Sequence, residues 1–462
     1  MVPMAMAMAM ASSKSDGLDS VISVLELIKE PMISVPHNYV QIDQQNPAFP
    51  VCSDHPLPAL PTIDFKLLVS DDTSDLELEK LHSSCKEWGF FQLVNHGVSS
   101  SLMNQLKHEI VEYYNLPFEE KRKYTVRPND FEGYGNAKLD GKLDWGDRFF
   151  MITNPVHRRK PHLLPELPPS FRNPLECYLL ELQRLAMKLL GFIAEALKVD
   201  LQEIEEMFDD GFQSVRMTNY PPCPQPELAI GFRPHSDGAG ITILNQVNGV
   251  DGLQIKKDGV WIPMKFIPDA LVVNVGDILE ILSNGVYKSV EHRVTTNPEK
   301  ERISVAFFVC PKLEAEVGPV TSLISPQNPP LFRRTGMEKY CKDFFSRKLH
   351  AKSFLETMKI ESTEEATLLH GNGGDEDDDD YDEDLVAVLD DSDEEDDSDE
   401  ELGNWAKLET MRSSHPMYFA KKLAQESEKD EVPRSGTSFY KLEMIKIQLI
   451  SAHEHKISSF GY

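Results

Sequence analysis

Apolar and polar residues follow two different periods along this chain, and the period changes near residue 211. Over residues 173–199, apolar side chains recur every three or four positions, as on a helix with one buried face. Asn173 is suited to cap this helix and Pro174 to occupy its first position, where a missing N–H costs little. The pattern therefore predicts a long core helix with a buried face made of residues 175, 179, 182, 186, 189, 193 and 197.

Upstream of that helix the chain is expected to be mainly helical. Apolar residues at helical spacing favour helices, and a serine at the start of the last of them is suited to cap it. Helices are expected at residues 19–31, 74–88 and 100–116, and extended segments at residues 60–68 and 89–97.

Residues 211–312 consist of short alternating segments separated by Gly, Asn and Asp, which indicates a β-rich domain. In "LQIKKDGVWIPM" the pair Asp258-Gly259 suits a tight hairpin turn. Many short strands with regular turn signals predict a sandwich or a jelly roll. The pattern returns to helix over residues 337–360.

Negative charge is concentrated at the C-terminal end of the chain. The formal net charge is −29 over 462 residues, and residues 361–462, with 29 acidic and 9 basic side chains, contribute −20 of it. Like charges repel and apolar residues are few in this segment, so a disordered acidic tail is expected. Such a charge also disfavours nucleic acids and anionic membranes as partners.

Targeting signals are weak in this sequence. No stretch reaches the roughly 18 apolar residues of a membrane span. Residues 1–17 are rich in Met and Ala, with no basic residue ahead of the apolar part as in a secretory signal. We expect a disordered leader on a cytoplasmic, monomeric protein; a plastid transit peptide is the alternative, favoured by the Ala and Ser content and opposed by the lack of Arg. The 6 scattered cysteines indicate free thiols in a reducing compartment.

Candidate metal chemistry lies in "RPHSDGAG". A strand points residues i and i+2 to the same face, so His235 and Asp237 converge if this segment is extended. Taken alone, such a pair is usually an exposed turn. A second histidine, His292, follows in the alternating stretch "VEHRV", far enough along the chain for a jelly roll to return it to the first pair. Two histidines and one carboxylate form the facial triad of non-haem Fe(II) sites.

A candidate anion pocket follows in "ERISVAFFV". Alternation places Arg302, Ser304, Ala306 and Phe308 on one face of a strand. An unpaired buried guanidinium is costly, so Arg302 indicates an anionic ligand that it can hold in bidentate fashion, with Ser304 donating a further hydrogen bond. Phe308 on the same face is a candidate substrate wall, and ordinary core packing is its alternative.

These motifs also carry a family resemblance. The segment from "PHSDGAGITIL" to "VEHRVTTNPEKERISVAFF", with "LPTIDF", "EWGFFQLVNHGV", "LDWGDRFFM" and "NYPPCPQPEL" upstream, resembles plant 2-oxoglutarate- and Fe(II)-dependent dioxygenases of the subgroup with SRG-type proteins and alkaloid O-demethylases. The resemblance covers about residues 18–360. It implies an α+β fold with a double-stranded β-helix (jelly roll) core and an N-terminal, mainly helical region.

The resemblance also implies roles for individual residues. The iron ligands would be His235, Asp237 and His292. Arg302 and Ser304 would hold the distal carboxylate of 2-oxoglutarate, and Tyr220 would contact the same co-substrate. The family commonly reads Asn-Tyr-Tyr before "PPCP", whereas this chain has Thr218 in place of the asparagine. We expect function to survive with altered co-substrate affinity, because threonine keeps a hydrogen-bonding group of shorter reach.

The expected organisation has five parts. They are a leader (1–17), an N-terminal region (18–172), a helix with the jelly-roll core (173–312, core about 211–312), a C-terminal helical extension (313–360) and the acidic tail (361–462).

The expected function is hydroxylation or O-demethylation of a small plant metabolite or hormone, with O2 and 2-oxoglutarate consumed, succinate and CO2 released, and ascorbate as reductant. Two alternatives stay open. One is an Fe(II) oxidase of the same fold that does not use 2-oxoglutarate, as aminocyclopropane-carboxylate oxidase does. The other is a non-catalytic interaction protein that acts through the acidic tail.

A chain shortened to residues 1–360 is expected to keep iron binding, stability and turnover within about twofold of the full chain. The physical reason is that charges more than about 8 Å apart are largely screened at physiological salt. Metal titration, thermal unfolding and succinate formation measured on both chains check this. Unfolding or inactivity of the shortened chain contradicts it.

Overall fold

The computed structural model describes residues 23–41, 59–70, 73–127, 130–136, 142–346 and 353–360. The chain divides into two units, residues 1–373 and 374–462, and every described residue belongs to the first. The leader (1–17) and the acidic tail (361–462) expected from the sequence lie outside the described residues. No helix in the described ranges is long and apolar enough to cross a membrane.

Two β-sheets form the centre of the first unit. In order of pairing, the large sheet contains β1 (Thr62–Asp64), β2 (Phe90–Val94), β10 (Leu271–Val275), β7 (Ile241–Gln246), β12 (Arg302–Val309), β5 (Gln213–Tyr220), β4 (Asp147–Asn154) and β3 (Gly133–Tyr134). The small sheet contains β6 (Ile230–His235), β11 (His292–Thr295), β8 (Leu253–Lys257) and β9 (Val260–Pro263). A separate pair is formed by β13 (Glu316–Val317) and β14 (Thr335–Gly336).

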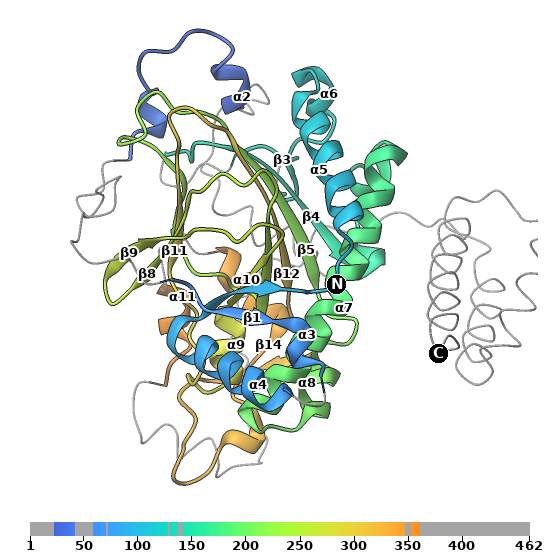
Figure 1. The fold of residues 1–462 in the computed structure, drawn as a ribbon, viewed down its shortest axis with the longest axis vertical. Helices are drawn as coiled ribbons and strands as arrows, with labels where there is room; N and C mark the ends of the chain where they lie inside the picture. Colours follow the sequence, from blue (N-terminus) through green and yellow to red (C-terminus); the bar gives the residue numbers. More distant parts are fainter. Residues whose placement is uncertain are drawn as a thin grey trace, which may run out of the picture. The chain divides into compact units, whose positions relative to one another are not determined.

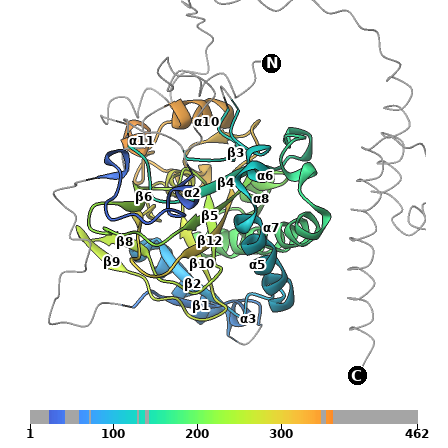
Figure 2. The same cartoon turned by 90° about the horizontal axis from the view of Figure 1, so that it is seen from above.

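Helices cover one face of the large sheet. Helices α5 and α7 run along this face, and the β8–β9 hairpin lies on the other side (Figure 1), as the view from above also shows (Figure 2). The helices are α2 (Val24–Leu27), α3 (Phe65–Leu68), α4 (Ser74–Ser83), α5 (Ser100–Asn115), α6 (Phe118–Arg122), α7 (Pro169–Leu197), α8 (Leu201–Phe208), α9 (Asp277–Leu282), α10 (Met337–Ser346) and α11 (Ser353–Thr357). A π-helical turn over Ser84–Trp88 continues α4.

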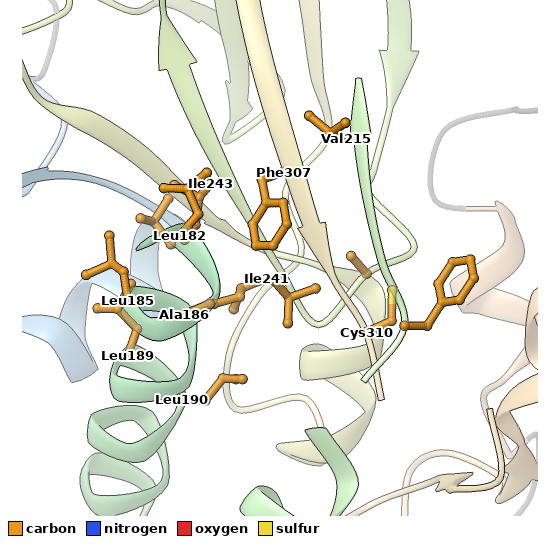
Figure 3. Packing of buried hydrophobic residues seen from close by; sticks show 14 of the residues in the cluster. Leu182, Leu185, Ala186, Leu189, Leu190, Val215, Ile241, Ile243, Phe307 and Cys310 are labelled. Carbon is orange, nitrogen blue, oxygen red and sulfur yellow. The ribbon is translucent and has the colours of Figure 1, made fainter. Parts of the chain in front are cut away.

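The long core helix is confirmed, but its predicted start is wrong. All seven apolar positions expected to form one face are buried. Figure 3 shows Leu182 of α7 beside Ile243, and Ala186 of α7 beside Ile241, both of the large sheet. The helix begins at Pro169 rather than after Asn173, so Pro174 lies inside it. The consecutive prolines Pro168 and Pro169 provide the helix start instead. Proline is tolerated there because the first N–H groups of a helix need no helical partner.

Other local predictions have mixed outcomes. The helix over residues 100–116 is confirmed as α5, and the side chain of Ser99 caps it. The extended segment at residues 60–68 is only half right, because the Asp64 side chain accepts a hydrogen bond from the Lys66 N–H and starts α3 there. The predicted helix over residues 19–31 is limited to α2 among the described residues.

Strand β4 was not predicted. It belongs to the region expected to be mainly helical, yet it pairs with β5 along nearly its whole length.

The Asp258-Gly259 hairpin is confirmed, since both residues have positive φ (51° and 78°) between β8 and β9, as a tight two-residue turn requires.

Two buried clusters lie on opposite faces of the large sheet. The larger one joins α7 and α5 to the face of β12 that carries Ile303, Val305 and Phe307. The smaller one lies between the two sheets and includes Phe90 and Tyr220 from the large sheet with Phe232 and Ile255 from the small sheet. Side chains from both sheets thus fill the space between them, as a jelly-roll core requires.

Replacement of the fully buried Leu182 by alanine is expected to lower the free energy of unfolding by about 2–5 kcal/mol, because it leaves a cavity between α7 and the sheet. Leu201→Ala, at a leucine that is 45% exposed on α8, is the matched control and should change it by less than about 0.5 kcal/mol. Urea unfolding of both variants measures the difference. Equal effects would show that α7 does not form the core in solution.

Candidate active site

Two histidines face each other across neighbouring strands of the small sheet. His235 is the last residue of β6, His292 is the first of β11, and the antiparallel register pairs them directly. Their ring centroids are 4.2 Å apart. Both are buried, and the pairing of β6 with β11 therefore brings together residues that are far apart in the sequence.

Asp237 completes this cluster from a loop. Strand β6 ends at His235, so Ser236 and Asp237 lie just beyond it. The backbone carbonyl of Asp237 instead accepts a hydrogen bond from the Asp277 N–H at 2.7 Å, which ties the loop to the start of α9. Asp237 Oδ1 lies 3.6 Å from His235 Nε2 and 3.8 Å from His292 Nε2. One ligand atom from each residue lies within 4.8 Å of the other two.

Hydrogen bonds determine which nitrogen of each histidine faces the cluster. Nδ1 of His235 lies 2.9 Å from the Arg233 carbonyl, and Nδ1 of His292 lies 3.1 Å from the Val290 carbonyl. A carbonyl only accepts, so each Nδ1 donates and each neutral ring keeps its lone pair on Nε2. His235 Nε2 is buried with no hydrogen-bond partner. A buried unpaired acceptor is unfavourable, and a metal ion in the cluster would satisfy it.

Electrostatics favours the ligating forms of these side chains. Burial alone would raise the pKa of the Asp237 carboxyl, but the two imidazoles and the Arg216 guanidinium outweigh burial and hold that pKa below its ordinary range. Burial lowers the pKa of His292 to about 4, and His235 adds to this effect against the opposing Asp237. At neutral pH the cluster therefore offers a carboxylate and an unprotonated imidazole, the forms that bind a divalent metal.

Two further side chains orient the Asp237 carboxylate. The Thr242 hydroxyl donates to Oδ2 at 2.7 Å, and Asn274 Nδ2 donates to the same oxygen at 2.9 Å. Thr242 comes from β7 and Asn274 from β10, which pair with each other at these two positions. Because Oδ2 is held by two donors, Oδ1 remains directed at the histidines.

A buried arginine forms the second part of the site. Arg302 on β12 is 2% exposed, and its register partner on β5 is Tyr220. Its guanidinium lies 5.1 Å from the centroid of the Tyr220 ring and donates to the Ser304 hydroxyl at 3.2 Å. The structure thus brings together the three residues expected to bind the co-substrate. Arg302 Nε is buried without a hydrogen-bond partner, as expected of a site that takes an anion.

The register of β5 determines what replaces the family's usual asparagine. Thr218 pairs with Ser304 and lies on the same face of β5 as Tyr220. The next residue, Asn219, faces the opposite way, and its Nδ2 donates to Glu301 Oε2 at 3.0 Å. Asn219 therefore does not take the place of the missing asparagine, and Thr218 is the residue that faces the site.

Aromatic rings and an arginine connect Phe308 to the histidine cluster. The Arg216 guanidinium lies 5.2 Å from the Phe308 ring and 4.4 Å from the Phe232 ring. The Phe232 ring in turn lies 4.3 Å from the His235 ring, edge to face. A hollow of about 270 Å³, its open mouth included, is lined in part by Arg216, Phe232 and Thr218. Phe308 contacts Arg216 but is not among the residues that line this hollow, and it also packs against the larger buried cluster. Its role as a substrate wall stays a prediction.

Sequence reasoning did not identify Thr242, Asn274, Arg216 or Gln246, which accepts from Arg302 Nη2 at 2.8 Å. Each is a polar residue in a strand that is otherwise apolar or alternating. That anomaly was visible in "ITILNQ", "LVVNV" and "SVRMTNY", but its meaning depends on which strands pair.

Comparisons with known proteins agree with this arrangement. Residues 211–311 match the model of the 2OG-Fe(II) oxygenase superfamily, and residues 60–170 match that of the non-haem dioxygenase in morphine synthesis N-terminal domain. The chain is 47% identical over 358 residues to oxoglutarate-dependent flavonoid 7-O-demethylase 1 of Ocimum basilicum, covering 76% of this chain and 95% of that protein. It is also 47% identical over 350 residues to codeine O-demethylase of Papaver somniferum, covering 74% and 96%.

A solved structure shows the same fold. The crystal structure of JOX2 in complex with 2OG, Fe and JA superposes with a TM-score of 0.67 at 34% sequence identity, covering 74% of this chain and 98% of that one. The resemblance to plant dioxygenases that the motifs predicted is thereby confirmed.

Removal of either group that orients Asp237 is expected to weaken metal binding by about tenfold, because the carboxylate then rotates away from the histidines. The variants are Thr242→Val and Asn274→Ala. Titration with Mn(II), a redox-stable stand-in, measures the affinity. Asn245→Ala is the control, since Asn245 on β7 faces away from Thr242. Unchanged affinity in both test variants contradicts the orienting role.

Proposed function

Because the chain belongs to the 2OG-Fe(II) oxygenase superfamily, we propose that it oxidises a C–H bond of a small aromatic plant metabolite, either hydroxylating it or removing an O-methyl group. The observation that carries this proposal is the buried cluster of two Nε2 atoms and one carboxylate oxygen, with His235 Nε2 lacking any protein partner. This donor set suits Fe(II) and leaves coordination positions for other ligands.

In the proposed site, Fe(II) would be held by His235 Nε2, His292 Nε2 and Asp237 Oδ1. The Arg302 guanidinium and the Ser304 hydroxyl bind the distal carboxylate of 2-oxoglutarate, and Tyr220 packs against it. Arg302 suits this role because its neighbours bury it while leaving Nε unpaired. A planar guanidinium matches a carboxylate with two parallel hydrogen bonds.

The reaction consumes one O2 and one 2-oxoglutarate for each C–H bond oxidised. Bound Fe(II) supplies the activation of O2, one oxygen atom of which enters succinate while the other enters the product, and CO2 is released. When the C–H bond belongs to a methyl ether, the hydroxylated methyl group leaves as formaldehyde and a free hydroxyl remains. The protein's own residues bind and orient the substrate and the co-substrate, and they exclude water from the site.

Substrate binding is proposed for the wall formed by Phe308, Arg216 and Phe232. Two rings and a guanidinium suit a planar, electron-rich ligand, because a cation attracts the face of an aromatic ring. The similarity to a flavonoid 7-O-demethylase and a codeine O-demethylase supports aromatic methyl ethers as the first substrates to test.

A substrate panel tests this function. The purified chain is incubated with Fe(II), 2-oxoglutarate, ascorbate as reductant and flavonoids or alkaloids in methylated and demethylated form. Mass spectrometry reports the gain of one oxygen atom or the loss of one CH2 group. Succinate that appears in step with product separates this function from that of an oxidase that does not use 2-oxoglutarate.

The ligand variants His235→Ala, Asp237→Ala and His292→Ala are each expected to lose at least about 100-fold in succinate formation while remaining folded, because a facial site with one ligand missing cannot hold the metal and both co-substrates. Turnover and circular dichroism measure the two effects. His82→Ala is the control, since His82 hydrogen bonds with Tyr287 outside the cluster. Near-normal turnover in any ligand variant contradicts the assignment.

A further inference from the structure

We propose that Gln246 is a positioning residue: it holds the Arg302 guanidinium in place for an incoming carboxylate without placing a negative charge beside it. The inference rests on the proposed role of Arg302 in binding 2-oxoglutarate. It concerns a neutral amide on β7 that no sequence motif singled out.

The contacts of Arg302 show how it is held. Nη2 donates to Gln246 Oε1 at 2.8 Å, and Nη1 donates to the Ser304 hydroxyl at 3.2 Å. Gln246 and Ser304 are register partners on β7 and β12, so the two acceptors come from adjacent strands and hold opposite sides of one planar group. Two such contacts fix the rotation of the guanidinium.

The orientation of the Gln246 amide is itself determined. Its Nε2 donates to the carbonyl of Val250, in the loop after β7. A carbonyl accepts only a donor, so the amide must direct its oxygen at Arg302. Gln246 thus connects the backbone of the β7–β8 loop to the guanidinium.

The arginine side chain has little room to move elsewhere. A Cβ added to Gly252 would lie 2.9 Å from Arg302 Cδ and 3.4 Å from its Nε, so the backbone passes close to the arginine stem. On the other side lies the Tyr220 ring. The stem is confined by packing and the head by Gln246 and Ser304, while Nε remains buried without a hydrogen-bond partner.

The neutrality of Gln246 has a functional consequence. A glutamate of the same length would accept the same hydrogen bond but would form a buried ion pair with Arg302. An entering carboxylate would then have to compete with a resident one and would meet like-charge repulsion. An amide positions the guanidinium without that competition.

The test uses the full chain loaded with Mn(II), which binds ligands without turnover, and measures 2-oxoglutarate affinity by calorimetry. Gln246→Met, which is of similar size and has only a weak thioether acceptor, is expected to bind about tenfold more weakly, and Gln246→Glu about 100-fold more weakly. Mn(II) affinity should be unchanged in both. In the Fe(II) enzyme, succinate formation should show a raised KM for 2-oxoglutarate with kcat within about twofold.

Two companion variants separate the possible failures. Gln254→Met removes a comparable amide contact to another buried arginine, since Gln254 Oε1 accepts from Arg293 Nε at 2.8 Å, and should leave 2-oxoglutarate affinity unchanged. Arg302→Lys should weaken it by about tenfold or more. If Arg302→Lys binds normally, the proposed role of Arg302 is wrong and this inference with it.

If Arg302→Lys is weakened but Gln246→Glu binds as tightly as the natural chain, only the inference about Gln246 is overturned. A role limited to the hydrogen bond with the guanidinium predicts that outcome, because glutamate keeps this bond and loses only the donation to the Val250 carbonyl. Thermal unfolding is measured on every variant. Should Gln246→Met fail to fold, the comparison of Gln246→Glu with the natural chain decides.

Discussion

The antiparallel pairing of β6 with β11 is the constraint on which the candidate site depends. It places His292 directly opposite His235 and leaves each Nδ1 beside a carbonyl two residues earlier in its own chain segment. A shift of this register by one residue would turn one imidazole to the other face of the sheet. Asp237 follows the end of β6, so the same pairing also sets where its loop begins.

The two faces of the large sheet have different roles: one packs against the helices, and the other carries candidate site residues. On β12 the outward residues, among them Ile303 and Phe307, pack against α7, and the inward residues include Arg302 and Ser304. Burial of the apolar residues on the outward face must offset the free-energy cost of keeping charged groups between the two sheets. Those inner groups are held mainly by neutral partners, which leaves their charge available to ligands.

Local patterns predicted the parts of this molecule that depend on local physics. The apolar face of α7 and the inward face of β12 follow from spacing along one segment, and the Asp258-Gly259 turn follows from two residues that tolerate positive φ. Strand β4 could not be predicted in this way, because its partner β5 lies about 60 residues away and pairing decides its conformation. The start of α7 was misplaced because two possible starts that contain proline, at Pro169 and Pro174, lie only five residues apart.

The same distinction explains what was missed in the site. The histidines and Arg302 stand out by residue type, whereas Thr242, Asn274 and Gln246 are ordinary polar residues whose roles exist only through neighbouring strands. Thr218 illustrates both cases: its departure from the family pattern was visible, but only the pairing with Ser304 shows that it faces the site while Asn219 turns away to Glu301. Threonine is smaller than asparagine and lines the hollow beside Arg216, so the substitution changes the space in front of Arg216 as well as a hydrogen bond.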